Sequence, residues 1–377
     1  MKLWPVVGIV FMQVFLCLAH LFLYHTWISF LDAPSAAVLL TLRIALTALS
    51  FSFIAAALLS FRSIQPLVRI FYTCAAAWLG FLNLLFWAAC ASWFVWYALL
   101  AVVSEARLTP LRPWIGAAFA AAALLAGLWG LVVARRIHVR HTAVALQGLP
   151  ANWRGRKALL ISDLHLGHVN GVSFSRRIVE MASALAPDIV FIPGDLFDGG
   201  QADSQTLLEP FRALKPPHGI YFSSGNHDEF GDMAAFTRAI EDVGIRVLSN
   251  ESVRVDGLSV LGVPFGDSTF PIRMRATLKA LLPAPGEAAV LLNHVPSRLP
   301  IVEEAGVALQ LSGHTHSGQI FPFTWLTRRI FGTFTHGLSR YGALTVVTSS
   351  GAGTWGPPMR IGSRSEMVLL TFEEQKS

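Results

Sequence analysis

Four long apolar stretches fill the first 136 residues, and they limit the fold more strongly than any other feature of the sequence. They cover residues 4–23, 36–61, 72–103 and 114–134. A helix of roughly 20 apolar residues crosses a hydrocarbon layer of ~30 Å while satisfying its own backbone hydrogen bonds. We therefore predict a multi-span helical transmembrane domain over residues 1–136. Four spans are expected. The third stretch is the least certain, since its length suits one long tilted helix or a helix with an interfacial extension, and five spans is the alternative.

The first stretch is too long for a secretory signal and has no small-residue cleavage site, so we expect it to remain as a helix. The basic residues predict how the helices are oriented. With the amino terminus inside, the inner side carries Lys2, Arg62, Arg69, Arg135, Arg136 and Arg140, and the outer side carries Arg107 and Arg112. The positive-inside rule then predicts an inner (cytoplasmic) membrane protein with a cytoplasmic second half. The opposite orientation, with a periplasmic site, is the alternative.

The charge of the chain belongs to its membrane part. Residues 1–150 hold nine Lys and Arg against two acidic residues, whereas residues 151–377 hold twenty against twenty-one. The net charge of +6 therefore does not indicate binding to a nucleic-acid polymer. All three cysteines lie in the apolar part, so the second half has neither a disulfide framework nor a thiolate metal site.

After a linker expected at residues 137–155, the pattern changes to short apolar runs that end in polar residues. Five of these runs are KALLISDLHLG, PDIVFIPGDLFDG, HGIYFSSGNHDEF, AVLLNHVPS and VALQLSGHTHSG. Each predicts a strand that presents Asp, His or Asn at its carboxyl end. Helical spacing at residues 173–186 and 232–244 places helices between the early strands. We predict an α/β domain over residues 156–377, a mixed β-sheet sandwich flanked by helices, with no further helices between the later strands.

The strand-end residues predict a metal site. A single Asp-x-His or His-x-His pair is more often structural than metal-binding, but five such strand ends point to one shared site. Together they supply three carboxylates, one amide and five imidazoles, a ligand set that suits two divalent cations. These residues are Asp163, His165, Asp195, Asp198, Asn226, His227, His294, His314 and His316.

The same segments resemble the five-part signature of the calcineurin-like metallophosphoesterases. The matching motifs are Asp163-Leu164-His165, Gly194–Asp198, Gly225–Asp228, His294 and Gly313–His316, and the match runs over about residues 156–373. Within that superfamily, GHTHSGQI and the closing SSGAGTWGPPMRIGSRSEMVLLTF resemble a bacterial membrane-associated branch. That branch includes UDP-2,3-diacylglucosamine hydrolases and phosphodiesterases of unsettled substrate.

The resemblance implies a role for each matching residue. One ion takes Asp163, His165 and His316, the other takes Asn226, His294 and His314, and Asp195 bridges them. His227 acts as the acid or orients phosphate, and Asp228 holds the ring of His227. The small residues Ser312, Gly313, Ser317 and Gly318 are expected to leave room for phosphate and metals, with Thr315 turned away in strand-like alternation. One position departs from the family, because Gly199 stands where several soluble relatives carry a phosphate-binding arginine.

Two divalent ions roughly 3.5–4 Å apart would produce a bridging hydroxide that attacks phosphorus in line. The mixed donor set favours manganese, with iron, zinc or magnesium as alternatives.

Residues 320–342 follow the last metal histidines and combine aromatic side chains with Arg328, Arg329 and Arg340. We expect this segment to bring an anionic lipid phosphate to the metals, and a packed hairpin with solvated arginines is the alternative. The leading hypothesis is a membrane-anchored phosphoesterase that cleaves a phosphodiester or pyrophosphate of a lipid-linked molecule such as UDP-2,3-diacylglucosamine. The alternatives are a tethered nucleotide phosphodiesterase, soluble or cyclic, and a non-catalytic sensor or transporter.

Overall fold

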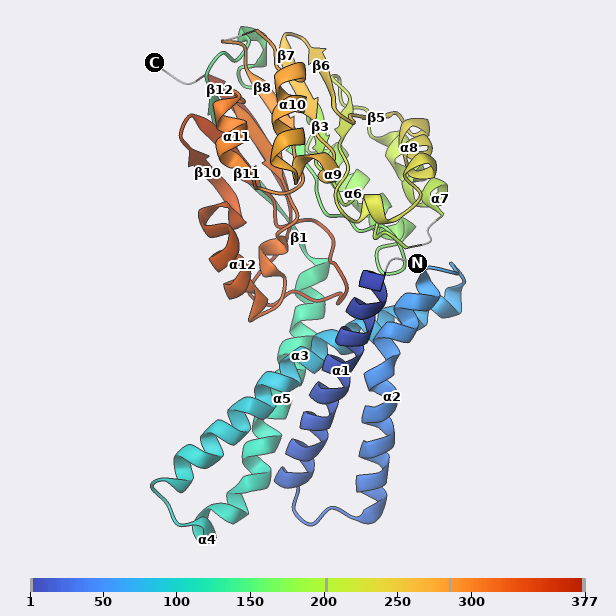
Figure 1. Cartoon of the computed structure of the whole chain (residues 1–377), viewed down its shortest axis with the longest axis vertical. Helices are drawn as coiled ribbons and strands as arrows, with labels where there is room; N and C mark the ends of the chain where they lie inside the picture. Colours follow the sequence, from blue (N-terminus) through green and yellow to red (C-terminus); the bar gives the residue numbers. More distant parts are fainter. Residues whose placement is uncertain (1–2, 201–202, 285, 375–377) are drawn as a thin grey trace. The chain divides into compact units, whose positions relative to one another are not determined.

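The computed structural model describes residues 3–200, 203–284 and 286–374 (Figure 1). The chain divides into two compact units. The first contains the chain up to Val132 together with Gly356–Met359, and the second contains Val133–Trp355 and the chain from Arg360 onwards.

The first unit is built from helices. They are α1 (Leu3–Phe30), α2 (Ala36–Ser60), α3 (Pro66–Leu100), the short α4 (Glu105–Leu108), the 3₁₀ turn η1 (Thr109–Leu111) and α5 (Arg112–Arg135). Four of them are long and apolar enough to cross a membrane, as predicted. The third apolar stretch lies in one continuous helix of 35 residues that begins with Pro66, a residue suited to the first helical turn. The five-span alternative is therefore wrong.

Polar side chains within this unit bind one another between helices. The indole Nε1 of Trp78 on α3 donates to Nε2 of His20 on α1 at 2.9 Å, and Nε1 of Trp93 donates to Oγ1 of Thr26 at 3.0 Å. Such bonds fix one helix against another where no water is present to compete. They join α1 to α3 beside an apolar core formed by side chains of α1, α2, α3 and α5.

The second unit contains two six-stranded sheets. The first sheet has the order β1-β12-β2-β3-β4-β5, and the second has the order β10-β11-β9-β8-β7-β6. The strands are β1 (Ile137–Leu146), β2 (Lys157–Leu160), β3 (Ile189–Ile192), β4 (Ile220–Phe222), β5 (Ile245–Val247), β6 (Glu251–Val255), β7 (Leu258–Gly262), β8 (Ala289–Leu292), β9 (Leu309–Ser312), β10 (Gly337–Tyr341), β11 (Leu344–Thr348) and β12 (Ser365–Glu374). Neighbouring strands from β2 to β5 are parallel, and so are β7, β8, β9 and β11.

Helices cover the outer faces of both sheets, and this confirms the predicted mixed α/β sandwich (Figure 1). The helices of this unit are α6 (Val172–Ala184), α7 (Ser204–Leu208), α8 (Met233–Asp242), α9 (Phe265–Ser268), α10 (Pro271–Leu281), α11 (Leu299–Glu304) and α12 (Phe323–Phe331), of which α12 packs on no strand among the described residues. Short 3₁₀ turns are η2 (Ala151–Trp153), η3 (Glu209–Ala213), η4 (Asp228–Phe230), η5 (His316–Gly318) and η6 (Gly332–Thr335). Because both faces are covered, every residue of β3, β8 and β9 is buried, as the unbroken apolar runs of β3 and β8 require.

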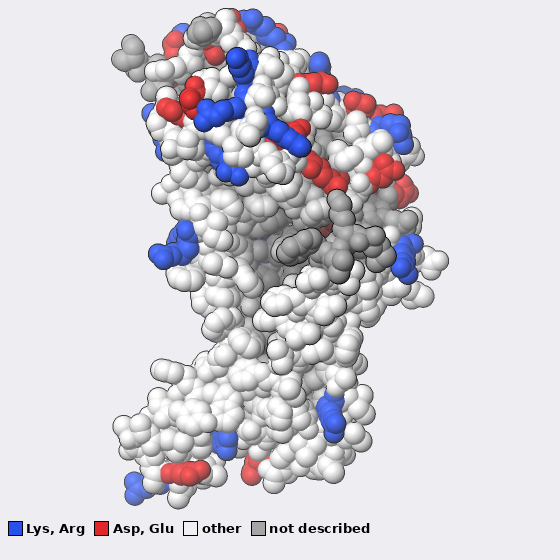
Figure 2. All heavy atoms as spheres, in the orientation of Figure 1, with Lys and Arg blue, Asp and Glu red and all other residues white. Residues whose placement is uncertain are grey.

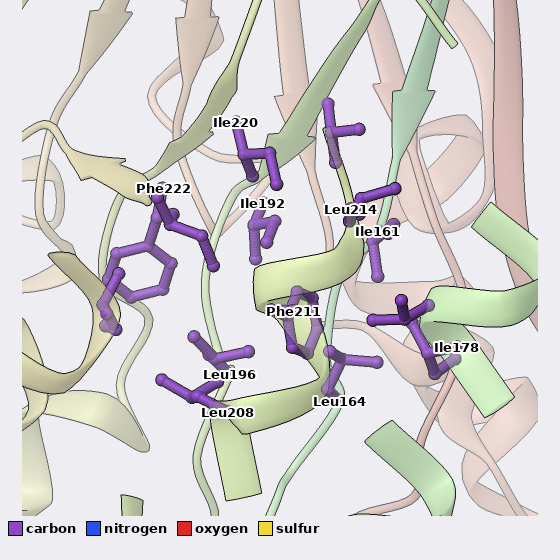
Figure 3. Close-up of a cluster of buried hydrophobic side chains, with 14 of the residues drawn as sticks. Ile161, Leu164, Ile178, Ile192, Leu196, Leu208, Phe211, Leu214, Ile220 and Phe222 are labelled. Atoms are coloured by element: carbon purple, nitrogen blue, oxygen red, sulfur yellow. The ribbon is translucent and has the colours of Figure 1, made fainter. Parts of the chain in front are cut away.

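The apolar core has three layers. Side chains of both sheets meet in the middle of the sandwich, where Leu160, Phe191 and Leu311 are fully buried. A second layer lies between the first sheet and its helices, and Figure 3 shows Phe211 and Leu208 beside Leu164 and Leu196 in it. A third lies beneath α10 and α11. These layers fix the strand ends that carry the polar motifs.

Residues 137–146 form a strand where a linker was expected. β1 pairs with β12 in parallel over its whole length, from Ile137 opposite Ser365 to Leu146 opposite Glu374. The boundary between the two units therefore lies near Val133. Of the expected linker, the residues between β1 and η2 form a connection without helix or strand. The pairing partner is more than two hundred residues away along the chain, so local pattern alone did not indicate it.

The later part of the domain also differs from the prediction. Helices α10 and α11 stand between strands for which no intervening helix was expected. Residues 323–331 form helix α12, and only β10, at the end of the aromatic and basic segment, makes a hairpin with β11. The packed-hairpin alternative is therefore wrong for most of that segment.

Candidate metal centre

The predicted ligands follow the carboxyl ends of the central strands of both sheets. Since these strands are parallel within each sheet, their carboxyl ends lie at one edge, where open α/β sheets place their binding sites. Asp163 and His165 follow β2, Asp195 follows β3, Asn226 and His227 follow β4, His294 follows β8, and His314 and His316 follow β9.

One group of ligands consists of Asp163, His165 and His316. The Nε2 atoms of His165 and His316 are 3.0 Å apart, and Nε2 of His316 is 3.3 Å from Oδ1 of Asp163. All three side chains are buried. Two imidazole nitrogens and a carboxylate oxygen therefore converge on one point.

A second group consists of Asp195, His294 and His314, with Asn226 beside them. Nε2 of His294 is 3.1 Å from Oδ2 of Asp195, and Nδ1 of His314 is 3.0 Å from Oδ1 of Asn226. Oδ2 of Asp195 also lies 3.6 Å from Nε2 of His165, in the first group. The structure thus brings all seven expected metal ligands together, with Asp195 next to both groups.

The residues fit divalent cations because their buried nitrogen and oxygen atoms face one another at 3.0–3.3 Å. Nδ1 of His294 donates to the Pro193 carbonyl at 3.0 Å, so Nε2, which lies 3.1 Å from Oδ2 of Asp195, is the ring nitrogen that can bind a metal. Within the described part of the chain, that buried Nε2 has no hydrogen-bond partner. Burial lowers the pKa of His294, but the charge of Asp195 outweighs it and raises the pKa to about 9. The same negative field attracts a divalent cation.

The pKa values of His314 and His316 fall. Burial, together with the charge of His294, lowers the pKa of His314 to about 3. Burial and the charge of His165 hold the pKa of His316 well below its ordinary value. Both rings are therefore neutral, which is the form that binds metals.

The backbone at the site is strained. Asp163, His165, Asp195, His314 and His316 all have positive φ, between 46° and 68°. Each such residue costs about 1–3 kcal/mol and persists only where its surroundings hold it in place. Part of that support is the Asp163 carboxylate, which accepts the backbone N–H of His314 at 2.9 Å.

Gly313, one of the small residues around the histidine pair, has a different purpose from the one expected. A Cβ at Gly313 would collide with Oγ of Ser162 and with the Asp163 carboxylate, so Gly313 leaves room for protein atoms and not for phosphate. Strand β9 ends at Ser312, and the histidines lie on a turn, so Thr315 does not follow strand alternation. Its hydroxyl donates to the Thr335 carbonyl at 2.7 Å.

The hydrogen bonds give Asp228 a role other than holding the ring of His227. Its buried carboxylate accepts the backbone N–H groups of Asp195, Phe197 and Gly225 at 2.8, 2.9 and 2.8 Å. Asp228 thereby ties the loop after β3 to the loop after β4.

The ring of His227 lies beside Asp198 instead. Nδ1 of His227 is 3.3 Å from the Asp198 carbonyl oxygen, and Oδ1 of Asp198 is 3.3 Å from Nδ1 of His165. Asp198 therefore contacts the rings of two site histidines. Its place in the Gly194–Asp198 motif was the signal that could have indicated this.

Two further residues were missed from the sequence. Arg360 is fully buried and donates to the carbonyls of His316, Ser350, Gly351 and Gly353.

The second residue is Gln319. It donates to the Trp355 carbonyl and accepts the Trp355 N–H, both at 2.9 Å. The exposed Trp355 ring lies 5.8 Å from the His227 ring. Both residues lie in segments that resemble the family, but neither is a metal ligand, so only their contacts show their roles.

The position without an arginine has no room for one. Gly199 has φ of 80°, and a Cβ there would lie 2.9 Å from the His227 carbonyl. Among the described residues, no hydrogen bond or ion pair joins Arg328, Arg329 or Arg340 to a metal-site residue.

Comparison with known proteins supports the superfamily. Residues 156–318 match the family described as calcineurin-like phosphoesterase. A transmembrane protein with metallophosphoesterase domain from Danio rerio is 33% identical over 66% of this chain and 60% of its own length. A protein of the same description from Bos taurus is 28% identical over 72% of this chain and 64% of its own. An uncharacterized metallophosphoesterase of Helicobacter pylori (strain ATCC 700392 / 26695) is 33% identical over 57% of this chain and 59% of its own. The chain thus spans about three fifths of the length of these relatives.

Proposed function

We infer that this chain, whose residues 156–318 match the calcineurin-like phosphoesterase family, is a membrane-bound phosphoesterase that requires two divalent metal ions. The observation that carries this proposal is the convergence of buried carboxylate, amide and imidazole groups from five strand ends. The ions would be held by Asp163, His165 and His316 on one side and by Asn226, His294 and His314 on the other, with Asp195 between them.

Two bound ions supply Lewis acidity and lower the pKa of water, and we propose manganese as the preferred metal. The protein positions the remaining groups. Because Nδ1 of His227 faces the Asp198 carbonyl, its Nε2 is available to bind a phosphoryl oxygen or to move a proton. Phe230 and Trp355 flank the His227 ring at 5.3 and 5.8 Å and limit the access of water to it. Asp228 holds the backbone on which Asp195 stands.

The test is hydrolysis of a soluble aryl phosphodiester by detergent-purified protein with manganese. Asp163→Ala and His227→Ala should each lower turnover by about 10²-fold or more, and Asp163→Ala should also lower the bound manganese measured by mass spectrometry. His141→Ala is the matched control, because His141 is an exposed histidine outside the site. Full turnover by folded Asp163→Ala and His227→Ala proteins would show that the site assignment is wrong.

We propose that the substrate is lipid-linked, with a phosphodiester or pyrophosphate of the UDP-2,3-diacylglucosamine kind as a candidate. The membrane helices keep the chain at a lipid surface, and Arg328, Arg329 and Arg340 are exposed on a segment that follows the metal histidines. Arginines bind phosphate through two parallel hydrogen bonds.

Replacing both Arg328 and Arg329 with Ser should slow hydrolysis of a lipid-linked substrate about tenfold and spare the aryl phosphodiester. The double change of Arg238 and Arg246 to Ser removes the same charge from an exposed part of α8 and β5 and serves as the control. Equal loss on both substrates would refute a role in lipid recognition.

The aromatic rings beside His227 favour a second candidate, a phosphodiesterase of soluble or cyclic nucleotides. Phe230 and Trp355 are 64% and 56% exposed, and exposed rings can stack on a nucleobase. Turnover of lipid-linked and soluble nucleotides by the same preparation in the same detergent separates the two candidates.

We further propose that the protein lies in the inner membrane with its catalytic unit in the cytoplasm. Six basic residues on the inner side against two on the outer side support this orientation. A reporter that fluoresces only in the cytoplasm, fused to the carboxyl terminus, should be fluorescent. If that fusion did not fluoresce and a reporter active only in the periplasm were active at the same position, the opposite orientation would be correct.

A further inference from the structure

Helix α12 exposes an apolar surface that a soluble domain would bury. Phe323, Leu326 and Ile330 follow helical spacing and lie on one line along the helix, with exposures of 52, 46 and 65%. Trp325, 63% exposed, extends this surface. We call these four residues the α12 face. An exposed apolar group of this kind marks an interaction site more often than a solvated surface.

The charge around the α12 face has one sign. Arg328 and Arg329 are exposed next to it, and residues 320–342 contain three arginines and no acidic residue. In Figure 2 the spheres over α12 are white and blue, without red. Apolar and aromatic side chains bordered by arginines are the pattern of a helix that lies in the headgroup region of an anionic bilayer. The basic border therefore favours an anionic lipid surface over an uncharged protein groove.

The helix also packs directly on the metal centre. A Cβ at Gly318 would collide with the backbone of Phe323 and Thr324, so the start of α12 lies against the turn that carries His316. At the other end, the ring of Phe331 lies 6.2 Å from the ring of His314. The helix thus contacts the turn of His316 at its start and the ring of His314 at its end, so whatever binds the outer face of α12 lies close to the metal ligands.

We propose that α12 is an interfacial helix whose α12 face inserts among anionic lipid headgroups and positions the metal centre at the bilayer surface. This surface interaction needs no catalysis, so it goes beyond the proposed phosphoesterase activity. It also accounts for access to a substrate whose phosphate lies at the depth of the headgroups.

The experiment uses the full chain in proteoliposomes of phosphatidylcholine, with or without phosphatidylglycerol. The native residues Cys17, Cys74 and Cys90 are replaced by Ala, and Ile330→Cys carries an environment-sensitive fluorophore. Ile272→Cys is the matched control, because Ile272 is an 84% exposed isoleucine on another helix, α10. Quencher-labelled lipid then reports contact with the bilayer.

In liposomes with phosphatidylglycerol, the probe at position 330 should shift its emission to the blue. Lipid-borne quencher should reduce its emission about twofold, whereas the probe at position 272 should stay solvent-like. Changing Arg328 and Arg329 to Ser should weaken the effect at position 330. A solvent-like probe at position 330, or equal quenching at both positions, would overturn the proposal. Shielding from an aqueous quencher without lipid quenching would also overturn it, because it would indicate contact with a second copy of the chain.

The same measurement in an Asp163→Ala background separates the two proposals. Since probe insertion requires no turnover, it should persist when catalysis is lost. If the probe did not insert but hydrolysis were normal, only the interfacial-helix proposal would be refuted. If the probe inserted but the protein with an unchanged metal site did not hydrolyse substrate, only the proposed activity would be refuted.

Discussion

Replacing Arg360 with Met should loosen the loop that holds His316. The guanidinium is fully buried, and its donors reach the carbonyls of His316 at 3.1 Å, Ser350 at 2.6 Å and Gly353 at 2.8 Å. Burial lowers the pKa of Arg360 to about 10, so the group stays charged at neutral pH. One cation therefore joins the metal-binding turn to the loop after β11.

The expected cost follows from these contacts. A hydrogen bond to a charged group contributes roughly 1.5–3 kcal/mol, but several of these bonds share one donor, and burying the charge offsets part of the gain. We expect Arg360→Met to lower the free energy of unfolding by about 3–5 kcal/mol, since it removes one partner of a buried network. A displaced His316 should also weaken metal binding by about 10–100-fold. Arg360→Lys should lose most of the same stability, because an ammonium group has fewer donors to share among these carbonyls.

The assay is thermal unfolding of the full chain in detergent with chelator, followed by a manganese titration. For a domain of this size, the loss corresponds to a decrease in Tm on the order of 10 °C. Arg364→Met is the control, because Arg364 is an exposed arginine four residues further along. If Arg360→Met melted within about 2 °C of the control and bound manganese equally well, the reasoning about this network would be refuted.

Three further outcomes test other parts of the site. Asp228→Asn should cost about 2–3 kcal/mol in chemical denaturation, because an amide cannot accept all three backbone N–H groups; an unchanged midpoint would contradict that role. Burial raises the pKa of Glu366, but His336 and Arg140 lower it to about 2, so its stabilisation is present above about pH 4.5 and is lost as the pH falls towards 2. The difference in unfolding free energy between wild type and Glu366→Gln should therefore be largest at pH 6 and should be smaller by about 3 kcal/mol near pH 2. A difference that does not change with pH would refute the assignment. Gly313→Ala should abolish most metal binding, measured by calorimetry, whereas the same change at the exposed Gly155 should not.

Local pattern predicted much of the site. The run KALLISDLHLG contains a strand and two ligands within eleven residues, and the other four motifs likewise join a strand to at least one ligand. Because parallel strands bring their carboxyl ends to one edge, the meeting of Asp163, Asp195 and Asn226, which follow neighbouring strands of one sheet, could be expected from the order of the motifs alone. The helices of the first unit were predictable for a similar reason, since apolar length alone identifies a span.

Contacts between distant segments were not predictable in this way. Asp228 follows His227 in the chain, yet its carboxylate binds backbone N–H groups and not the neighbouring ring. A side chain's direction depends on which partners the fold brings near it, and adjacent residues can point to opposite sides. The sequence could identify Asp228 as part of a motif, but it could not assign its role.

The sequence by itself determined the chemistry, namely the donor atoms, the strand ends that present them and the apolar helices, because each depends on a few neighbouring residues. Only the tertiary structure decided how that chemistry is supported. It paired β1 with β12, placed Arg360 under the turn of His316 and packed α12 against Gly318 of that turn and against the ring of His314. These contacts join residues far apart in the chain, and their formation depends on the packing of the whole domain.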